Sequence, residues 1–333
     1  MSGSASFTSM LGPTIEQYLA LKEALGRRYA VERKILQHLD QFLATGGHGH
    51  AELTCVAFDS WCQTLQHLCS GVRRNRMRVV RNLCLYRRRT MPACFVPDLS
   101  QFPSLHQPIR PYIFTETDIV RLLRLTDTLD ATSGSPIRRE VFRLAVVLLY
   151  TSGLRRSELL HLTLGDYDPR EQTLLVRASK FHKSRLMPLS ADGAREIEAY
   201  LKVRRTHRLP AAGGAPLLCN SRRDGGAYSG EGFAHGIRAL LHAAGIRTAE
   251  GHLPRVHDFR HSFAVRALVR WYGAGADVQA KLPFLAAYMG HVSIASTEYY
   301  LSFVEPLASA ASERFAQHCG ALVRALRATG GTP

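Results

Sequence analysis

Apolar residues recur at three- and four-residue steps along much of the chain, the spacing that places them on one face of an α-helix. In the first part of the sequence this pattern predicts two helices between residues 13 and 45, the second of which ends before Gly46. Two further helices are predicted over 52–69 and 71–89. We therefore expect the front of the chain to be entirely helical.

A segment of different composition follows, from about residue 90 to residue 111. Its prolines deny the chain helical continuity and favour an extended connection. They are Pro92, Pro97, Pro103, Pro108 and Pro111. We predict a helical domain over 1–105, a linker over 106–114 and a second domain over 115–333.

The second domain combines helices with one β-hairpin. Thr115 is expected to begin a helix, because Glu116 and Asp118 then lie in the first turn and suit the helix dipole. Two β-like runs, 173–178 and 185–189, are joined by a short polar turn and predict the hairpin. The remaining helices are predicted over 136–150, 191–207, 230–244, 257–271, 277–289, 292–301 and 306–328. The fold class is therefore mainly α with a small antiparallel β-sheet.

The charge of the chain points to a polyanionic partner. Lys and Arg number 43 against 27 acidic residues, which gives a net charge of +16, and such a charge favours binding to phosphates. No acidic residue lies between Asp59 and Asp98. A helix with one sign of charge usually faces an anion, although a plain solvated face is the alternative. We expect DNA-backbone contacts from Arg73, Arg74, Arg76, Arg78 and Arg81.

The seven cysteines form no Cys-x-x-Cys pair, so a thiolate zinc site has no support in the sequence. Cys55, Cys62 and Cys69 recur every seven residues, which predicts that they are buried on one side of a helix. The odd count fits a reducing cytoplasm. The first residues do not resemble a signal peptide, and the longest apolar run, 144–150, is too short to span a bilayer. A cytoplasmic location without a membrane partner is therefore expected.

Phosphodiester cleavage needs a nucleophile, positive charge on the non-bridging oxygens and an acid for the leaving oxygen. The second domain offers such groups in a fixed order. Each has an ordinary structural explanation when it is taken alone: a helix junction, a solvated turn or a packed core group. The order is Arg155, then Lys180 after 25 residues, then His257-x-x-Arg260, then His291, then Tyr300 after nine residues.

A zinc hydrolase is a rival interpretation of one part of this set. His257 and His261 are four residues apart, which would place two imidazoles on one face of a helix. A zinc site would need a third ligand, and Arg260 between the two histidines disfavours a cation there. We therefore expect no metal site.

The ordered set of groups resembles the catalytic domain of the tyrosine recombinases, which include the phage integrases and the Xer proteins. The resemblance covers about residues 111–305, and the front domain more loosely resembles the helical core-binding domain of these enzymes. It implies an α+β integrase-type catalytic domain. The strings DVQAKLPFL and YMGHVSI are similar to recombinases encoded by multi-recombinase transposons.

The resemblance also implies roles for the cationic residues. Arg155 and Arg260 would clamp the phosphate. His257 and His291 would form hydrogen bonds with it and assist proton transfer. Glu158 would hold the geometry of the active-site arginines.

Tyr300 matches the nucleophile of the family, and Tyr299 falls where the family usually has a non-nucleophilic side chain. Lys180 stands in the position of the hairpin lysine that protonates the leaving 5′ oxygen. The glycines that usually flank this lysine are replaced here, so Lys183 remains an alternative.

The family implies a site-specific recombinase that cleaves and rejoins DNA through a 3′-phosphotyrosine intermediate, for integration, excision or transposition of a mobile element. It requires neither a cofactor nor a metal. The implied partner is double-stranded DNA, bound by a homo-oligomer that forms a synaptic tetramer, with sister recombinases as further candidates and a nucleoid-associated location. The alternative is a catalytically silent DNA-binding accessory protein of a recombination complex.

Overall fold

The computed structural model describes residues 7–27, 29–45, 52–104, 110–177, 184–220 and 226–291. Its contacts divide the chain into two compact units, unit 1 (Met1–Ile109) and unit 2 (Arg110–Pro333). Each unit has a hydrophobic core of its own.

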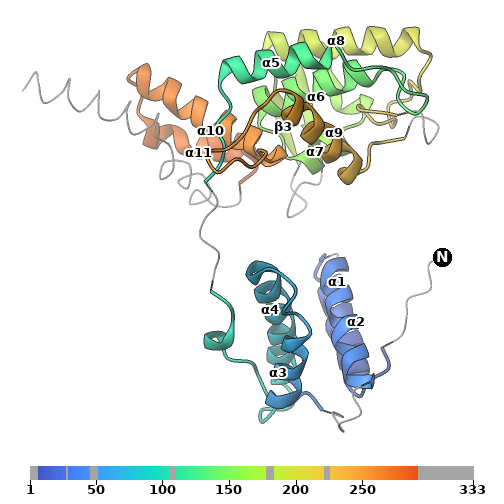
Figure 1. Ribbon diagram of the computed structural model, residues 1–333, viewed down its shortest axis with the longest axis vertical. Coiled ribbons are helices and arrows are strands. Elements are labelled where there is room, and N and C mark those ends of the chain that lie inside the picture. Colours follow the sequence, from blue (N-terminus) through green and yellow to red (C-terminus); the bar gives the residue numbers. More distant parts are fainter. Residues whose placement is uncertain are drawn as a thin grey trace, which may run out of the picture. The chain divides into compact units, whose positions relative to one another are not determined.

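The described part of unit 1 is a small helical bundle, which confirms the expected helical front. In Figure 1, α1 and α2 lie side by side, and α4 packs against both of them. The helices are α1 (Gly12–Ala24), α2 (Ala30–Thr45), α3 (Cys55–Gln63) and α4 (Ser70–Arg87), followed by the short 3-10 helix η1 (Leu99–Gln101). Their apolar faces enclose fully buried Tyr18, Leu36, Phe58, Trp61 and Leu83.

The prediction that three cysteines share one buried helix side was wrong. Helix α3 ends at Gln63, so Cys69 lies outside it and precedes α4. Cys55 and Cys69 are exposed and Cys62 is half-buried. A seven-residue repeat keeps side chains on one face only while the helix continues, and this helix stops too early.

Unit 2 is built around α6, a helix in which 10 of the 15 residues are buried. Helices α5, α7, α8 and α10 all pack against it, and Figure 1 shows α6 in the middle of the unit. The helices of the described part are α5 (Glu116–Thr126), α6 (Arg138–Ser152), α7 (Arg156–His161), α8 (Ala191–Thr206), α9 (Gly230–Ala243), α10 (Val256–Gly273) and α11 (Val278–Met289). The apolar run 144–150 is thus the centre of a core helix, and among the described helices none is long and apolar enough to cross a bilayer.

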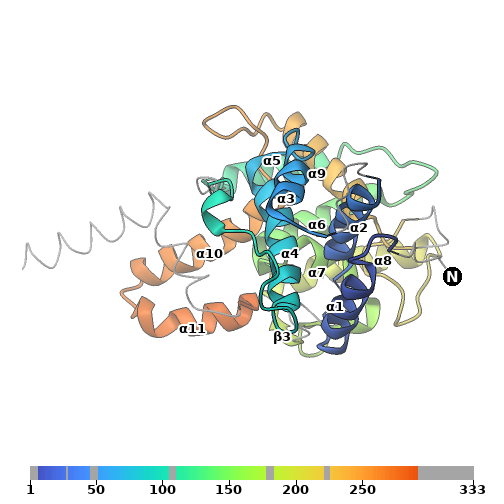
Figure 2. The same ribbon diagram turned by 90° about the horizontal axis from the view of Figure 1, so that it is seen from below.

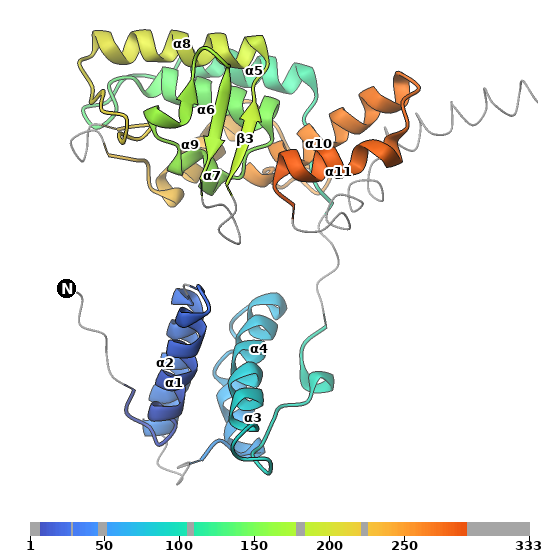
Figure 3. The same cartoon turned by 180° about the vertical axis from the view of Figure 1, so that it is seen from behind.

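A three-stranded antiparallel sheet completes unit 2 (Figure 3). Its strands are β1 (Tyr167–Asp168), β2 (Thr173–Val176) and β3 (Arg185–Pro188), in the order β1-β2-β3. The predicted hairpin is confirmed by the pairing of β2 with β3. Strand β1 was not predicted, because two residues are too short to show an alternating pattern.

The start of unit 2 follows the expected capping pattern. The Thr115 hydroxyl accepts the Asp118 N–H at 3.1 Å, and the Asp118 carboxylate accepts the Thr115 N–H at 3.0 Å. The adjacent Phe114 stacks on Phe259 of α10 at 4.2 Å, and its N–H donates to Ser262 at 2.8 Å. The first turns of α10 are therefore fixed to the beginning of the unit.

Helices α10 and α11 form a pair that lies side by side in Figure 2. A second core cluster, which includes Leu268, Leu282 and Leu285, holds them together. The pair thereby brings the end of α11 back to the first turns of α10. The predicted helices 292–301 and 306–328 lie outside the described residues.

Candidate active site

Arg155 lies in the turn that joins α6 to α7. The preceding Gly153 has φ of +61°, and a Cβ there would lie 2.6 Å from the ring of Phe263, so this turn requires glycine. The backbone N–H of Arg155 donates to the Glu158 carboxylate at 2.9 Å, and its Nη1 donates to the same carboxylate at 2.6 Å. Glu158 therefore fixes both the backbone and the guanidinium of Arg155.

Arg260 reaches the same region from α10, and both arginines bind the end of α11. Arg260 Nη2 donates to the Met289 carbonyl at 2.5 Å, and Arg155 Nη2 donates to the Gly290 carbonyl at 3.0 Å. Arg260 is only 1% exposed. Three segments far apart in the sequence thus meet immediately before His291.

His257 and His291 complete this cluster. Burial lowers the pKa of His291 to about 4, and the charges of Arg260 and Arg155 contribute to the same shift. Burial also lowers the pKa of His257, with further contributions from Arg260 and Arg255. Both imidazoles are therefore neutral at pH 7 in the DNA-free protein, and a neutral imidazole can donate or accept a hydrogen bond.

The structure brings Arg155, Glu158, His257, Arg260 and His291 together. Lys180, Lys183, Tyr299 and Tyr300 lie outside the described residues. The strands that flank the lysines, β2 and β3, are described and pair in register from Thr173–Pro188 to Val176–Arg185.

His257 and His261, the pair on which the zinc interpretation rested, have rings 4.8 Å apart. Across the described ranges, no group of three or more His, Cys, Asp or Glu side chains is placed to hold a metal ion.

Sequence reasoning missed Arg185, the first residue of β3. Its Nη1 and Nη2 each donate to a different oxygen of Glu158 at 3.0 Å, and its Nε donates to the Tyr288 carbonyl at 2.8 Å. Arg155 and Arg185 form one ion-pair network around the buried carboxylate of Glu158, called the Glu158 network below. It connects the strand after the lysine hairpin to α7 and to the end of α11.

The Glu158 network controls the charge of its carboxylate. Burial alone would raise the pKa of Glu158, but the hydrogen bonds from Arg185 and Arg155 outweigh burial and lower this pKa to about 2. The carboxylate is therefore ionised throughout the physiological pH range and stands between two guanidinium groups.

The alternation of side chains along β3 could have indicated a buried Arg185, but the apolar Leu186 favoured the opposite face as the buried one. Alternation along a strand places Arg185 and Met187 on one face and Leu186 on the other. An apolar residue normally faces inward, yet Leu186 is 64% exposed and Met187 is buried. The inward face is thus the one that carries the arginine, because Glu158 supplies a buried counter-charge.

Gly290 is expected to be required for the approach of Arg185 to α11. It has φ of +66°, and a Cβ there would lie 2.8 Å from Arg185 Nη1. Gly290→Ala should therefore lower the free energy of unfolding by the cost of the left-handed conformation, about 1 kcal/mol or more, and by a further loss from the displaced guanidinium. Urea unfolding followed by circular dichroism measures both.

Gly245→Ala is the matched control for that prediction. Gly245 has φ of +64°, but a Cβ added there would meet nothing within 4 Å, so only the backbone cost applies. Equal losses in the two variants would contradict a role of Gly290 in admitting Arg185.

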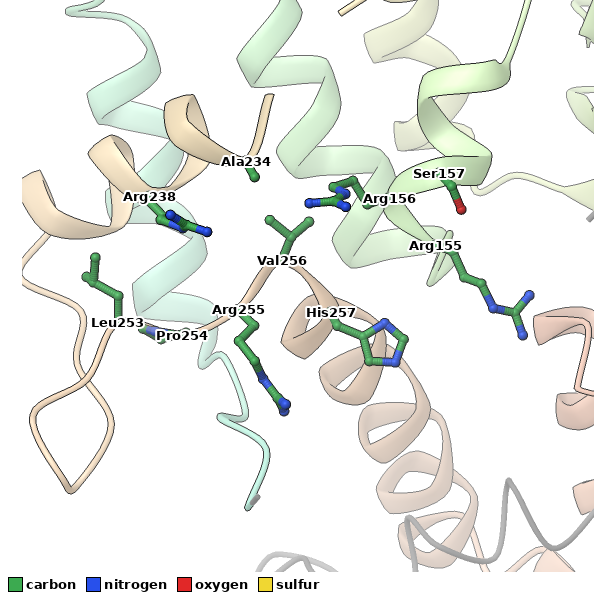
Figure 4. Close-up of a pocket in the computed structure, with 10 residues that line it drawn as sticks. All are labelled: Arg155, Arg156, Ser157, Ala234, Arg238, Leu253, Pro254, Arg255, Val256 and His257. Carbon is green, nitrogen blue, oxygen red and sulfur yellow. The ribbon is translucent and has the colours of Figure 1, made fainter. Parts of the chain in front are cut away.

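A cavity of about 420 Å³ opens beside the cluster, between the starts of α7 and α10 and the side of α9. Figure 4 shows the side chains that line it. Its charged and titratable lining residues are Arg155, Arg156, Arg238, Arg255 and His257, and none of the described residues that line it is acidic. The space next to Arg155 and His257 is thus suited to an anion.

The arginines predicted to contact DNA in unit 1 all lie in α4. Arg74 donates to the Pro103 carbonyl at 2.6 Å and Arg81 to the Pro97 carbonyl at 3.0 Å. These two side chains therefore attach the proline-rich segment to the helix. Among the described residues, the one hydrogen-bond acceptor of the Arg78 side chain is Asn75, at 2.8 Å.

Comparison with known proteins identifies the family of the chain. The sequence model of the phage integrase family matches residues 113–304. The putative integrase/recombinase y4rB of Sinorhizobium fredii is 31% identical over 290 residues, which cover 86% of this chain and 91% of that protein. The tyrosine recombinase XerD of Rhizobium meliloti is 29% identical over 59% of this chain and 58% of its own. The chain belongs to the phage integrase family of tyrosine recombinases.

Solved structures share the fold. The Tn1549 transposon integrase in complex with circular intermediate DNA matches with a TM-score of 0.62 and 19% identity, over 91% of this chain and 99% of that one. A lambda integrase dimer bound to a core site matches with a TM-score of 0.58 and 14% identity, over 88% and 95%. At this level of identity the likeness concerns the fold, a mainly helical architecture with a small antiparallel sheet.

Proposed function

We propose that the protein is a site-specific DNA recombinase that cleaves and rejoins DNA strands through a 3′-phosphotyrosine intermediate, in the integration, excision or transposition of a mobile element. The observation that carries this proposal is the meeting of Arg155, Arg260 and His291 at the end of α11. Family membership supports it, and the solved relatives with DNA bound support double-stranded DNA as the partner.

In the proposed cleavage step, the Tyr300 hydroxyl passes its proton to a neutral imidazole, His257 or His291, while its oxygen attacks the phosphorus and forms a new phosphodiester bond. The bond from phosphorus to the 5′ oxygen of the next nucleotide breaks. Arg155 stabilises the charge on the non-bridging oxygens through its planar fork of donors. Arg260 acts from the buried side of the site, where its charge is screened little by water.

The leaving 5′ oxygen needs a proton, and we assign this role to Lys180 with Lys183 as the alternative. Both follow β2 in the hairpin whose second strand begins at Arg185. The Glu158 network would then align the base of the hairpin with Arg155. Attack by a 5′ hydroxyl of another strand reverses the step, and because one phosphodiester replaces another, no cofactor is required.

We propose that unit 1 contributes DNA-backbone contacts through α4. Arg78 has only a local partner on this helix, while Arg74 and Arg81 also hold the proline-rich segment. Residues 106–114 would act as the linker between the two domains. Strand exchange between two DNA sites needs several active sites, so we propose a tetramer on DNA, formed by this chain or with sister recombinases.

The first test is formation of a covalent product. The protein is incubated with a nicked duplex from the end of its own element, in the presence of EDTA, and the mixture is run on a denaturing gel. We expect a protein–DNA band that protease removes, because the phosphotyrosine bond survives denaturation and its formation needs no metal. A native-gel shift without a covalent band would instead identify a silent DNA-binding accessory protein.

A further inference from the structure

Two arginines of the cavity beside the active site differ from the others in having no side-chain partner. Arg155 is paired with Glu158, and Arg255 Nη2 donates to Asp258 at 2.8 Å. Within the part of the chain that the structure describes, the side chains of Arg156 and Arg238 form no hydrogen bond or ion pair, and both are exposed. The cavity therefore carries two guanidinium groups without a counter-charge.

The two arginines come from elements that pack together. Arg156 is the first residue of α7, and its guanidinium lies next to the start of α9, since a Cβ at Gly230 would be 3.7 Å from Arg156 Nη2. Arg238 lies further along α9, and α7 packs on α9. Figure 4 shows both side chains at the cavity, which Arg155 and His257 also line. We call Arg156 and Arg238 the α7–α9 wall.

Like charges gathered around one cavity repel each other unless an anion occupies the space between them. Arginine presents several N–H donors in one plane and binds two phosphate oxygens at once. No acidic side chain stands among the described lining residues, so the donors of these arginines are available to a ligand. The chemistry of the α7–α9 wall is thus that of a phosphate site.

We propose that the α7–α9 wall binds a backbone phosphate of DNA that neighbours the phosphate to be cleaved. This inference rests on the proposed function, which places the cleaved phosphate at Arg155. The wall would hold the strand on one side of the reacting phosphate and fix its direction across the site. Its contacts are to the backbone, so they contribute affinity and register and carry no base sequence.

The test measures how the affinity for DNA depends on salt. Dissociation constants are determined by fluorescence anisotropy with a labelled mixed-sequence duplex for the parent protein and for the double variant Arg156→Gln/Arg238→Gln. Loss of this one phosphate contact lowers the slope of log affinity against log salt by roughly 0.9, so between about 50 and 200 mM salt the loss of affinity should be about 3.5-fold smaller in the double variant.

Arg124→Gln/Arg205→Gln is the matched control. Both of these arginines are exposed on helices that do not line the cavity, and neither side chain has a hydrogen-bond or ion-pair partner among the described residues. The control removes the same charge and should keep the parent slope. Equal slopes in the two double variants would overturn the proposed wall.

A second arm locates the phosphate and separates this inference from the proposed function. Neutral methylphosphonates are placed one at a time around the cleaved position of the nicked duplex. We expect the parent to lose affinity at one neighbouring position to which the Arg156→Gln/Arg238→Gln variant is insensitive. If the parent forms the covalent product but each methylphosphonate changes the affinity of both proteins equally, the phosphate site at the α7–α9 wall is rejected and the proposed function is retained. If the parent forms no covalent product, the proposed function fails, whatever the salt slope.

Discussion

Tyr300→Phe is expected to abolish the covalent protein–DNA product, with a loss in rate of at least about 10³-fold. The substitution removes one oxygen, the atom that forms the bond to phosphorus, and phenylalanine has no group that can replace it. The measurement is single-turnover formation of the denaturation-resistant band on the nicked duplex. A native gel of the same samples shows that the variant still binds DNA.

Tyr299→Phe is the control that the chain itself offers. The two tyrosines are adjacent, so consecutive side chains of a helix there would point about 100° apart and could not serve one phosphate equally. The nine-residue step from His291 selects Tyr300. Loss of the covalent band in Tyr299→Phe with retention in Tyr300→Phe would reverse the assignment.

The fold could be predicted where a long segment repeats one pattern. Helices α6, α8, α9, α10 and α11 have enough turns for the three- and four-residue spacing to stand out, and they occupy the expected ranges. The pattern failed where an element was short, as in β1, or where a helix ended before its repeat did, as after α3. The local sequence pattern predicts which face of a helix is buried, but it does not predict the residue at which tertiary packing ends the helix.

The site could be predicted to the extent that its chemistry is distinctive. The order of the separated arginines and histidines predicted that they meet at one site, and α10 with α11 brings Arg260 and His291 to Arg155. The supporting contacts could not be predicted. Arg185 and Arg156 look like ordinary surface arginines in the sequence, and only the fold shows that one is buried against Glu158 while the other lines the cavity.

The position of Arg155 in the site depends on contacts with other residues of the fold. The Arg155 guanidinium donates to the Glu158 carboxylate of α7 and to the Gly290 carbonyl at the end of α11. Arg155 also lines the cavity. The first contact depends on the charge of Glu158, and the second depends on the Gly290 carbonyl after α11. A change at Glu158 should therefore act on positioning and on stability together.

Glu158→Gln is expected to lower the free energy of unfolding by about 3–5 kcal/mol at pH 7, because removal of one member of a buried ion pair leaves the other charges uncompensated. Glutamine keeps the shape but leaves Arg155 and Arg185 facing each other without a carboxylate. Misplacement of Arg155 should also slow covalent product formation by roughly 10²-fold. Urea unfolding and the single-turnover assay measure the two effects.

The pH dependence distinguishes loss of the charge from loss of packing. The pKa of Glu158 is about 2 in the folded protein, below the ordinary value of 4.5 for a glutamate. A lowered folded-state pKa means that the stabilisation is complete above pH 4.5 and is lost as the pH falls from there through about 2. The difference between the parent and Glu158→Gln should therefore be constant from pH 7 to about pH 5 and should shrink below it.

Glu171→Gln provides the control, since Glu171 is exposed and its side chain has no hydrogen-bond or ion-pair partner among the described residues. It should follow the parent at every pH. A gap between the parent and Glu158→Gln that stayed the same down to about pH 3 would attribute the loss to packing, and the Glu158 network would then not act through its charge.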